Sequence, residues 1–128
     1  MDRKQDRTYR ILIVDDGEDF REALKDFLVH SGYRVQEASD GRKALDLLRK
    51  PHSIDLVLLD IHMPGSNGVE ILSEIKKIFP ELDVIILTGY NAQDVAASIP
   101  KGHARDCIEK TMDPSKIIEI IEKTLKIN

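Results

Sequence analysis

The sequence predicts one doubly wound α/β domain, in which five parallel strands alternate with five helices. Two observations support this prediction. Apolar runs alternate with segments of helical periodicity five times along the 128 residues. Residues 56–59 and 84–87 are apolar at every position, which is typical of strands buried on both faces of a parallel sheet.

The first two strand–helix units occupy the first 51 residues. Residues 10–14 form the first predicted strand, and the helix after it ends at Ser31-Gly32. Residues 34–38 alternate in polarity and predict a more exposed strand, and the next helix follows Asp40-Gly41 and ends at Pro51. Core-facing residues recur at helical spacing in both helices: Phe20, Leu24, Phe27 and Leu28 in the first, and Ala44, Leu45 and Leu48 in the second.

Three further units complete the chain. The third strand, residues 54–59, leads into Asp60, and Asn67 is expected to cap a helix that ends at Pro80. The fourth strand, residues 84–87, leads into Thr88, and a helix poor in apolar residues follows at 92–99. The fifth strand, residues 106–109, leads into Lys110, and the last helix starts at Asp113-Pro114. The predicted apolar faces are Ile71, Leu72, Ile75, Ile78 and Phe79 in the third helix, and Ile117, Ile118, Ile121 and Leu125 in the last.

The connections define the architecture. Right-handed crossovers place helices on both faces of the sheet, and five units in so short a chain favour the flavodoxin-like strand order 2-1-3-4-5. A closed eightfold barrel would need about 250 residues. Residues 1–9 are expected to be an N-terminal leader with a basic cluster, and residues 10–128 the domain.

The composition predicts a cytoplasmic domain. The net charge of −4 argues against nucleic acid as a direct partner. No apolar stretch approaches the roughly 18 residues that a membrane span requires, and the N-terminus has no apolar signal core. Cys107 is the only cysteine, which excludes an internal disulfide and fits a reducing compartment.

Polar residues end four of the five predicted strands: Asp15-Asp16, Asp60, Thr88 and Lys110. The carboxyl ends of parallel strands share one edge, and in the order 2-1-3-4-5 the first and third strands are neighbours, so the three carboxylates should converge. Like charges roughly 4 Å apart cost about 4 kcal/mol at an effective dielectric constant near 20, which a cation must compensate. Oxygen ligands without a Cys or a His pair predict a hard ion, Mg²⁺ or, in its place, Mn²⁺.

Each residue also has an ordinary structural interpretation. Asp15-Asp16 alone could equally cap the first helix. Thr88 alone could be a strand-end hydroxyl, and Lys110 a solvated lysine. The side chains of His30, His52, His62 and His103 are expected to be surface residues rather than metal ligands. A carboxylate, a divalent cation, a hydroxyl and an ammonium in one crevice nevertheless suit phosphoryl transfer, and an Asp carboxylate can itself accept the group.

The motifs, in this order, resemble the receiver domains of bacterial two-component response regulators. Those motifs are Asp15-Asp16, Asp60-Ile61-His62-Met63-Pro64 with Gly68, Thr88-Gly89 and Ile108-Glu109-Lys110, and the resemblance extends from about Arg10 to Leu125. It implies that Asp60 accepts a phosphoryl group from a histidine kinase or histidine phosphotransfer protein. The domain would then catalyse only its own phosphorylation and dephosphorylation, and phosphorylation would control binding to a protein target or output domain.

The resemblance also assigns roles at the site. Asp16 and Asp60 would ligate Mg²⁺, Asp15 would act largely through water, and His62 would contribute its backbone carbonyl. Thr88 and Lys110 would bind the phosphoryl oxygens and report their presence to the surface, and Thr88 and Cys107 would form the switch region. His62 and Tyr90 occupy the positions that flank the path of the hydrolytic water in this family, and two bulky side chains there predict slow dephosphorylation.

The sequence departs from the family pattern near the fifth strand. Cys107 occupies the switch position, where the family usually has Tyr or Phe, and Thr111 follows the Lys in place of the usual Pro. His103-Ala104 stands where Gly-Ala is customary. These departures put in doubt the transmission of the signal rather than the phosphorylation chemistry. The expected state is a monomer or a weak, phosphorylation-dependent dimer.

Three other classes of protein are alternatives to a phosphorylated receiver domain. A flavodoxin-type carrier would need a hydroxyl- and glycine-rich phosphate loop after the first strand, where this chain has acidic residues. A haloacid-dehalogenase-like phosphatase would need a second Asp two positions after Asp60, where His62 stands. The remaining alternative is a receiver-like docking module that is not phosphorylated and whose switch has decayed.

Overall fold

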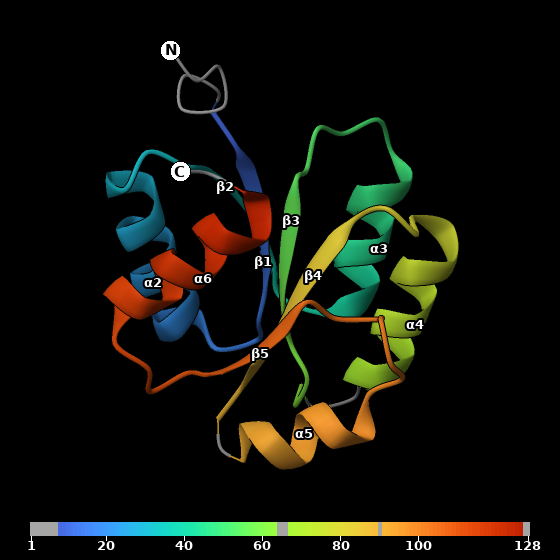
Figure 1. The fold of residues 1–128 in the computed structure, drawn as a ribbon. Helices are drawn as coiled ribbons and strands as arrows, with labels where there is room; N and C mark the ends of the chain where they lie inside the picture. Colours follow the sequence, from blue (N-terminus) through green and yellow to red (C-terminus); the bar gives the residue numbers. More distant parts are fainter. Residues whose placement is uncertain (1–7, 64–66, 90, 127–128) are drawn as a thin grey trace.

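Figure 1 shows the computed structural model, which describes residues 8–63, 67–89 and 91–126. A central sheet separates two helices on one side, α2 and α6, from α3 and α4 on the other, while α5 lies beside β5 (Figure 1). In chain order the elements are β1 (Arg10–Val14), α2 (Glu18–His30), β2 (Arg34–Ala38), α3 (Gly41–Arg49), β3 (Leu56–Asp60), α4 (Gly68–Ile78), β4 (Asp83–Thr88), α5 (Ala92–Ser98), β5 (Asp106–Glu109) and α6 (Pro114–Leu125).

The five strands are all parallel and lie in the order β2-β1-β3-β4-β5, which confirms the predicted flavodoxin-like topology. Strand β3 is buried at all five of its positions, and β4 at every position after Asp83. Strand β2 is a half-exposed edge strand, as its alternating polarity predicts. The strand order reverses between β1 and β3, and because these strands are parallel neighbours their carboxyl ends lie side by side at the topological switch point.

Each face of the sheet carries its own apolar core, because successive strand residues point to opposite sides. Leu12, Val57 and Ile86 pack toward α3 and α4. Ile11, Leu58 and Ile85 pack toward α2 and α6. Tyr9, which precedes β1, belongs to the second core and is 5% exposed. No helix in the described part of the chain is long and apolar enough to span a bilayer.

Helix starts follow the sequence signals, with one exception. Asn67 accepts hydrogen bonds from the amides of Val69 and Glu70, and Asp113 accepts one from the Ser115 amide, so both predicted N-caps are confirmed. Gly17 is the N-cap of α2 and makes no side-chain cap. The capping interpretation of Asp15-Asp16 is therefore wrong.

Element boundaries and burial differ from expectation at a few positions. Strand β3 starts at Leu56 rather than at residue 54 and includes Asp60. Ile78 was expected on the buried face of α4 but is 41% exposed. At 3.6 residues per turn, Ile78 lies at the margin of the stripe defined by Leu72 and Ile75, both fully buried, and in the last turn of the helix.

Candidate functional site

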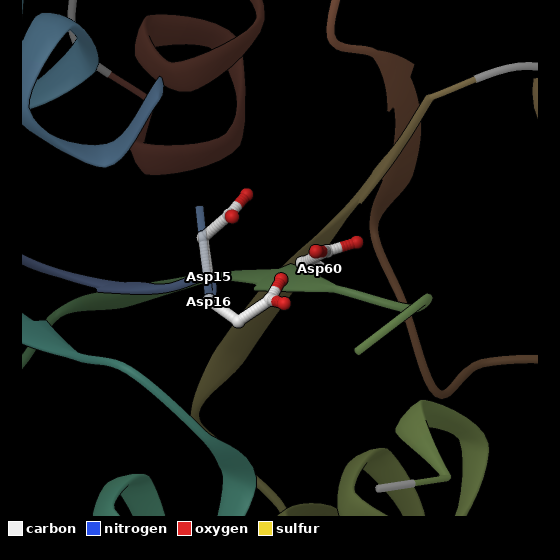
Figure 2. Close-up of side chains that lie close together, drawn as sticks. All are labelled: Asp15, Asp16 and Asp60. Atoms are coloured by element: carbon white, nitrogen blue, oxygen red, sulfur yellow. The ribbon is translucent and has the colours of Figure 1, made fainter. Parts of the chain in front are cut away.

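Three carboxylates meet at the carboxyl edge of the sheet (Figure 2). Asp15 and Asp16 directly follow β1, and Asp60 is the last residue of the neighbouring strand β3. Each side chain offers an oxygen within 4.8 Å of the others. Asp15 and Asp60 are buried whereas Asp16 is exposed, so the cluster opens to solvent on the Asp16 side. The predicted convergence of the three residues is confirmed.

Asp60 is 2% exposed and is held from two directions. Its Oδ1 accepts a hydrogen bond of 3.0 Å from the His62 amide, and its Oδ2 accepts one of 3.1 Å from Lys110 Nζ. The pKa of Asp60 is nevertheless raised, chiefly by burial and further by the neighbouring Asp15 carboxylate, which together outweigh the His62 and Lys110 contacts. Asp60 is thus an oriented carboxylate whose negative charge is incompletely compensated.

Lys110 is the cation of the site. Its ammonium lies 2.6 Å from Asp15 Oδ2 and 3.1 Å from Asp60 Oδ2, and 4.8 Å from the centre of the Phe20 ring. Burial alone would lower the pKa of Lys110, but the two carboxylates raise it above the ordinary value, so the group is fully charged at neutral pH. The Lys110 amide also donates to the Thr88 carbonyl at 2.7 Å, which continues the pairing of β4 and β5 beyond the last strand residue.

Thr88 completes the set of strand-end residues. It is fully buried and follows Leu87, the β4 residue in register with Asp60. The fold therefore brings Asp15, Asp16, Asp60, Thr88 and Lys110 to one edge, as the sequence predicts. The His62 side chain is exposed. Tyr90 lies outside the described residues.

The contacts of Arg21 and Lys25 beside Asp15 were not predicted from the sequence. Arg21 Nη1 donates to the Asp15 carbonyl at 2.6 Å, and Arg21 Nε donates to Glu37 at 3.1 Å. Lys25 also pairs with Glu37, at 3.1 Å. Local sequence carries no signal for these contacts, since they depend on how α2 crosses β1 and β2.

Cys107, at the expected switch position, is half-buried in β5 and lines a cavity of about 430 Å³ between α5 and β5. The walls of this cavity include the small side chains Ala92, Ala96 and Ala104. The pKa of Cys107 is raised by burial and by the carboxylates of Asp106 and Glu109. Both effects disfavour the thiolate, which argues against a redox role.

The acidic cluster fits a hard divalent cation. All three donors are carboxylates, and within the described residues the single positive charge of Lys110 pairs with two of them, Asp15 and Asp60. A net negative charge remains, and the exposed Asp16 leaves a way in for an ion. Oxygen donors with this residual charge suit Mg²⁺. Asp15, Asp16 and Asp60 would hold the ion, as receiver domains typically hold theirs.

Comparison with known proteins agrees with this geometry. Residues 11–122 match the family model described as Response regulator receiver domain. The chain is 38% identical over 120 residues to the chemotaxis protein CheY of Thermotoga maritima, covering 91% of this chain and 98% of that protein. It is 36% identical over 118 residues to the sporulation initiation phosphotransferase F of Bacillus subtilis, covering 92% and 94% respectively.

Solved structures show the same relationship. The CheY-like receiver domain protein of Methanospirillum hungatei superposes with a TM-score of 0.86 at 29% identity, covering 94% of this chain and 95% of that one. The response regulator TrrA of Thermotoga maritima, solved in complex with Mg²⁺ and BeF, has a TM-score of 0.83 at 34% identity, covering 91% and 98%. Because both the family model and full-length relatives match over nearly the whole chain, this chain belongs to the response regulator receiver domain family.

Proposed function

We propose that Asp60 accepts a phosphoryl group from a phosphohistidine on a histidine kinase or histidine phosphotransfer protein. The observation that carries this proposal is the placement of Asp60 within the acidic cluster and beside Lys110, at the open edge of the sheet. Receiver domains are not conventional enzymes, and the domain would catalyse only reactions of its own aspartate.

In the proposed reaction a carboxylate oxygen of Asp60 attacks the phosphorus of the donor. A new P–O bond forms to Asp60 while the P–N bond to the donor imidazole breaks, and the bond's electron pair stays on the imidazole nitrogen. The His62 amide fixes one carboxylate oxygen of Asp60 and so orients the other. Positioning of this kind contributes much of the rate enhancement in phosphoryl transfer.

Charge on the transferred group would be balanced by residues already in place. Lys110, fully charged, is near enough to Asp60 to contact the phosphoryl oxygens, and the Thr88 hydroxyl would bind another of them. A bound Mg²⁺ would neutralise part of the remaining negative charge. Asp16 and Asp60 would ligate it directly, Asp15 largely through water, and His62 through its backbone carbonyl, with Mn²⁺ able to substitute.

We further infer that the domain works in the cytoplasm, where histidine kinases present their phosphohistidine. Phosphorylation would control its binding to a protein target or to an output domain. Nucleic acid and membrane are not expected as direct partners. The expected assembly is a monomer or a weak dimer that forms on phosphorylation.

The proposal is tested by incubating the protein with Mg²⁺ and acetyl phosphate and measuring its intact mass. The parent should gain one phosphoryl mass, Asp60→Asn should gain none, and Asp46→Asn, which changes an exposed aspartate on α3, should behave like the parent. No gain in the parent, or an equal gain in Asp60→Asn, would reject phosphorylation at Asp60. That outcome would favour a non-phosphorylated docking module instead.

A further inference from the structure

One side chain connects the end of β1 to helix α2 and to the edge strand β2. Arg21, on α2, donates through Nη1 to the Asp15 carbonyl at 2.6 Å and through Nε to Glu37 Oε1 on β2 at 3.1 Å. The side chain of Arg21 is only 16% exposed although it is a guanidinium on a surface helix. A half-buried guanidinium whose Nη1 and Nε atoms are both hydrogen-bonded has little conformational freedom.

The Asp15 carbonyl needs this partner because strand pairing stops beside it. The Asp15 amide still donates to the carbonyl of Ala38, the last residue of β2. After Ala38 the chain leaves the sheet to begin α3, so β2 offers no amide to the Asp15 carbonyl. Arg21 takes that place and thereby fixes the peptide plane between Asp15 and Asp16.

That peptide plane is the backbone link to Asp16, and so it constrains the direction in which the Cα–Cβ bond of Asp16 leaves the chain. Asp15 is anchored through its side chain, which accepts from the Gly17 amide at 2.7 Å and pairs with Lys110. For the exposed Asp16, by contrast, the restraint acts on the backbone that carries the side chain. The Asp16 carboxylate lies within 4.8 Å of those of Asp15 and Asp60 (Figure 2).

Arg21 is in turn held in place from β2. Glu37 accepts from Arg21 and, through its other oxygen, pairs with Lys25 at 3.1 Å. Burial of Glu37 acts to raise its pKa, but these two cations lower it below the ordinary value, so Glu37 is ionised at neutral pH. Arg21 therefore has a charged anchor on one side and the Asp15 carbonyl on the other.

We propose that Arg21 is a positioning residue for the cation site: it fixes the Asp15–Asp16 peptide so that the Asp16 and Asp60 carboxylates can share one ion. This inference rests on the proposed Mg²⁺ site, and it assigns a role to a residue that touches neither the ion nor the phosphoryl group. Residues that orient metal ligands typically contribute 10- to 100-fold to metal affinity.

Charge alone would act in the opposite direction. Arg21 places a positive charge near three carboxylates, so removing it should strengthen the attraction for a cation if nothing else changes. Loss of positioning should weaken cation binding. The sign of the change in Mg²⁺ affinity therefore separates a positioning role from a purely electrostatic one.

The test is a calorimetric titration with MgCl₂ alone, which measures the dissociation constant for Mg²⁺ in the parent and in matched variants. Arg21→Met should raise the dissociation constant roughly tenfold. Lys25→Met is the matched control, because Lys25 carries the same charge one turn later on the same helix and pairs with Glu37 rather than with Asp15. The dissociation constant of Lys25→Met for Mg²⁺ should equal that of the parent or be lower. Arg21→Lys, which can still donate to the Asp15 carbonyl, should recover part of the affinity.

Glu37→Gln provides a second test that leaves Arg21 in the chain. It weakens the anchor of the guanidinium and should raise the dissociation constant for Mg²⁺ by a smaller factor. Thermal unfolding without Mg²⁺ monitors folding of each variant separately, because a merely structural role would lower the melting temperature without changing Mg²⁺ affinity. If the parent binds Mg²⁺, and Arg21→Met and Glu37→Gln both bind it as tightly as the parent or more tightly, the positioning role is overturned. Failure of the parent itself to bind Mg²⁺ would overturn the metal site and the positioning role together.

Discussion

Lys110 donates to Asp60 at 3.1 Å, yet the pKa of Asp60 stays above its ordinary value. The ammonium is shared, because it lies still closer to Asp15, at 2.6 Å. Burial and the Asp15 carboxylate therefore dominate the electrostatics of Asp60. The residue proposed as the phosphoacceptor is held in a charge state that the fold disfavours.

Asp60→Asn should therefore stabilise the protein in the absence of Mg²⁺. An acid whose pKa is raised in the folded state contributes stability at low pH that is lost as the pH rises through that pKa. The variant and the parent should differ little well below the ordinary pKa of 3.8, where Asp60 is protonated in both the folded and unfolded states. By pH 7 the variant should gain on the order of 1 kcal/mol in the free energy of unfolding.

Urea unfolding at the two pH values measures this difference, and Asp46→Asn controls for the general loss of one negative charge. Saturating Mg²⁺ should stabilise the parent more than the variant, because only the parent keeps all three carboxylates. A parent more stable than Asp60→Asn at pH 7 without Mg²⁺ would contradict the electrostatic picture.

Gly68→Ala should destabilise the fold by about 2 kcal/mol, because a Cβ there would overpack the loop that follows Asp60. A Cβ on Gly68 would lie 2.5 Å from the carbonyl oxygen of Ile61 and 2.6 Å from its Cα, both rigid backbone atoms. Gly89→Ala is the matched control, since a Cβ on Gly89 meets nothing within 4 Å. Chemical denaturation of both variants checks the prediction, and equal stability of the two would refute it.

Glu109→Ala should loosen α5. This helix of seven residues buries none of them, and its N-cap Asn91 makes no side-chain cap. Glu109 supplies one instead, because its Oε2 accepts from the Ala92 amide at 3.2 Å. A cap of this kind contributes about 1 kcal/mol, so amide exchange across α5 should accelerate roughly fivefold.

Hydrogen exchange followed by mass spectrometry can compare Glu109→Ala with Glu119→Ala, an exposed substitution on α6. Protection in α5 should fall only in the first variant. Because Glu109 precedes Lys110, this contact joins the site to α5 without using Cys107. Unaltered hydrogen-exchange protection of α5 in Glu109→Ala would contradict this connection between the site and α5.

His62→Asn combined with Tyr90→Ala should speed dephosphorylation severalfold. The exposed His62 side chain follows the proposed phosphoacceptor by two residues, and the family resemblance places both residues beside the path of the hydrolytic water. Smaller side chains would give water easier access to the phosphoryl group. Loss of phosphoryl mass over time, after removal of acetyl phosphate, measures the rate. Equal rates in the parent and the double variant would reject this interpretation.

Cys107 should alkylate slowly. Burial raises the pKa of its thiol, and Asp106 and Glu109 raise it further, so the thiolate is scarce at pH 7. Iodoacetamide should modify the native protein more slowly than it modifies free glutathione, and unfolding in urea should remove the difference. Native reactivity equal to that of glutathione would reopen a redox role for Cys107.

The sequence sufficed for features that are encoded locally. Apolar runs, and alternating polarity in the case of β2, located the five strands. Asn67 and Asp113 marked helix starts because a cap depends on residues only two or three positions away. The convergence of Asp15 with Asp60 followed from strand order alone. Each of these inferences requires only chain direction and periodicity.

Features that depend on side chains meeting across elements were not predictable. The contact of Arg21 with the Asp15 carbonyl requires α2 to cross the end of β1 at one particular angle. The exposure of Ile78 depends on where the packed stripe of α4 ends, which its apolar character does not indicate. The sharing of Lys110 between Asp15 and Asp60 depends on one rotamer of a long side chain.

The strand order also has a consequence for how the protein is made. The acidic cluster is supplied by the ends of β1 and β3, whereas its lysine follows β5, the last strand of the sheet in chain order. During vectorial synthesis the ribosome therefore releases three mutually repelling carboxylates well before the ammonium that binds two of them. Docking of β5 against β4 completes the sheet and brings in the ammonium that offsets part of this negative charge. Until β5 docks, Asp60 therefore lacks the ammonium with which it pairs in the folded domain.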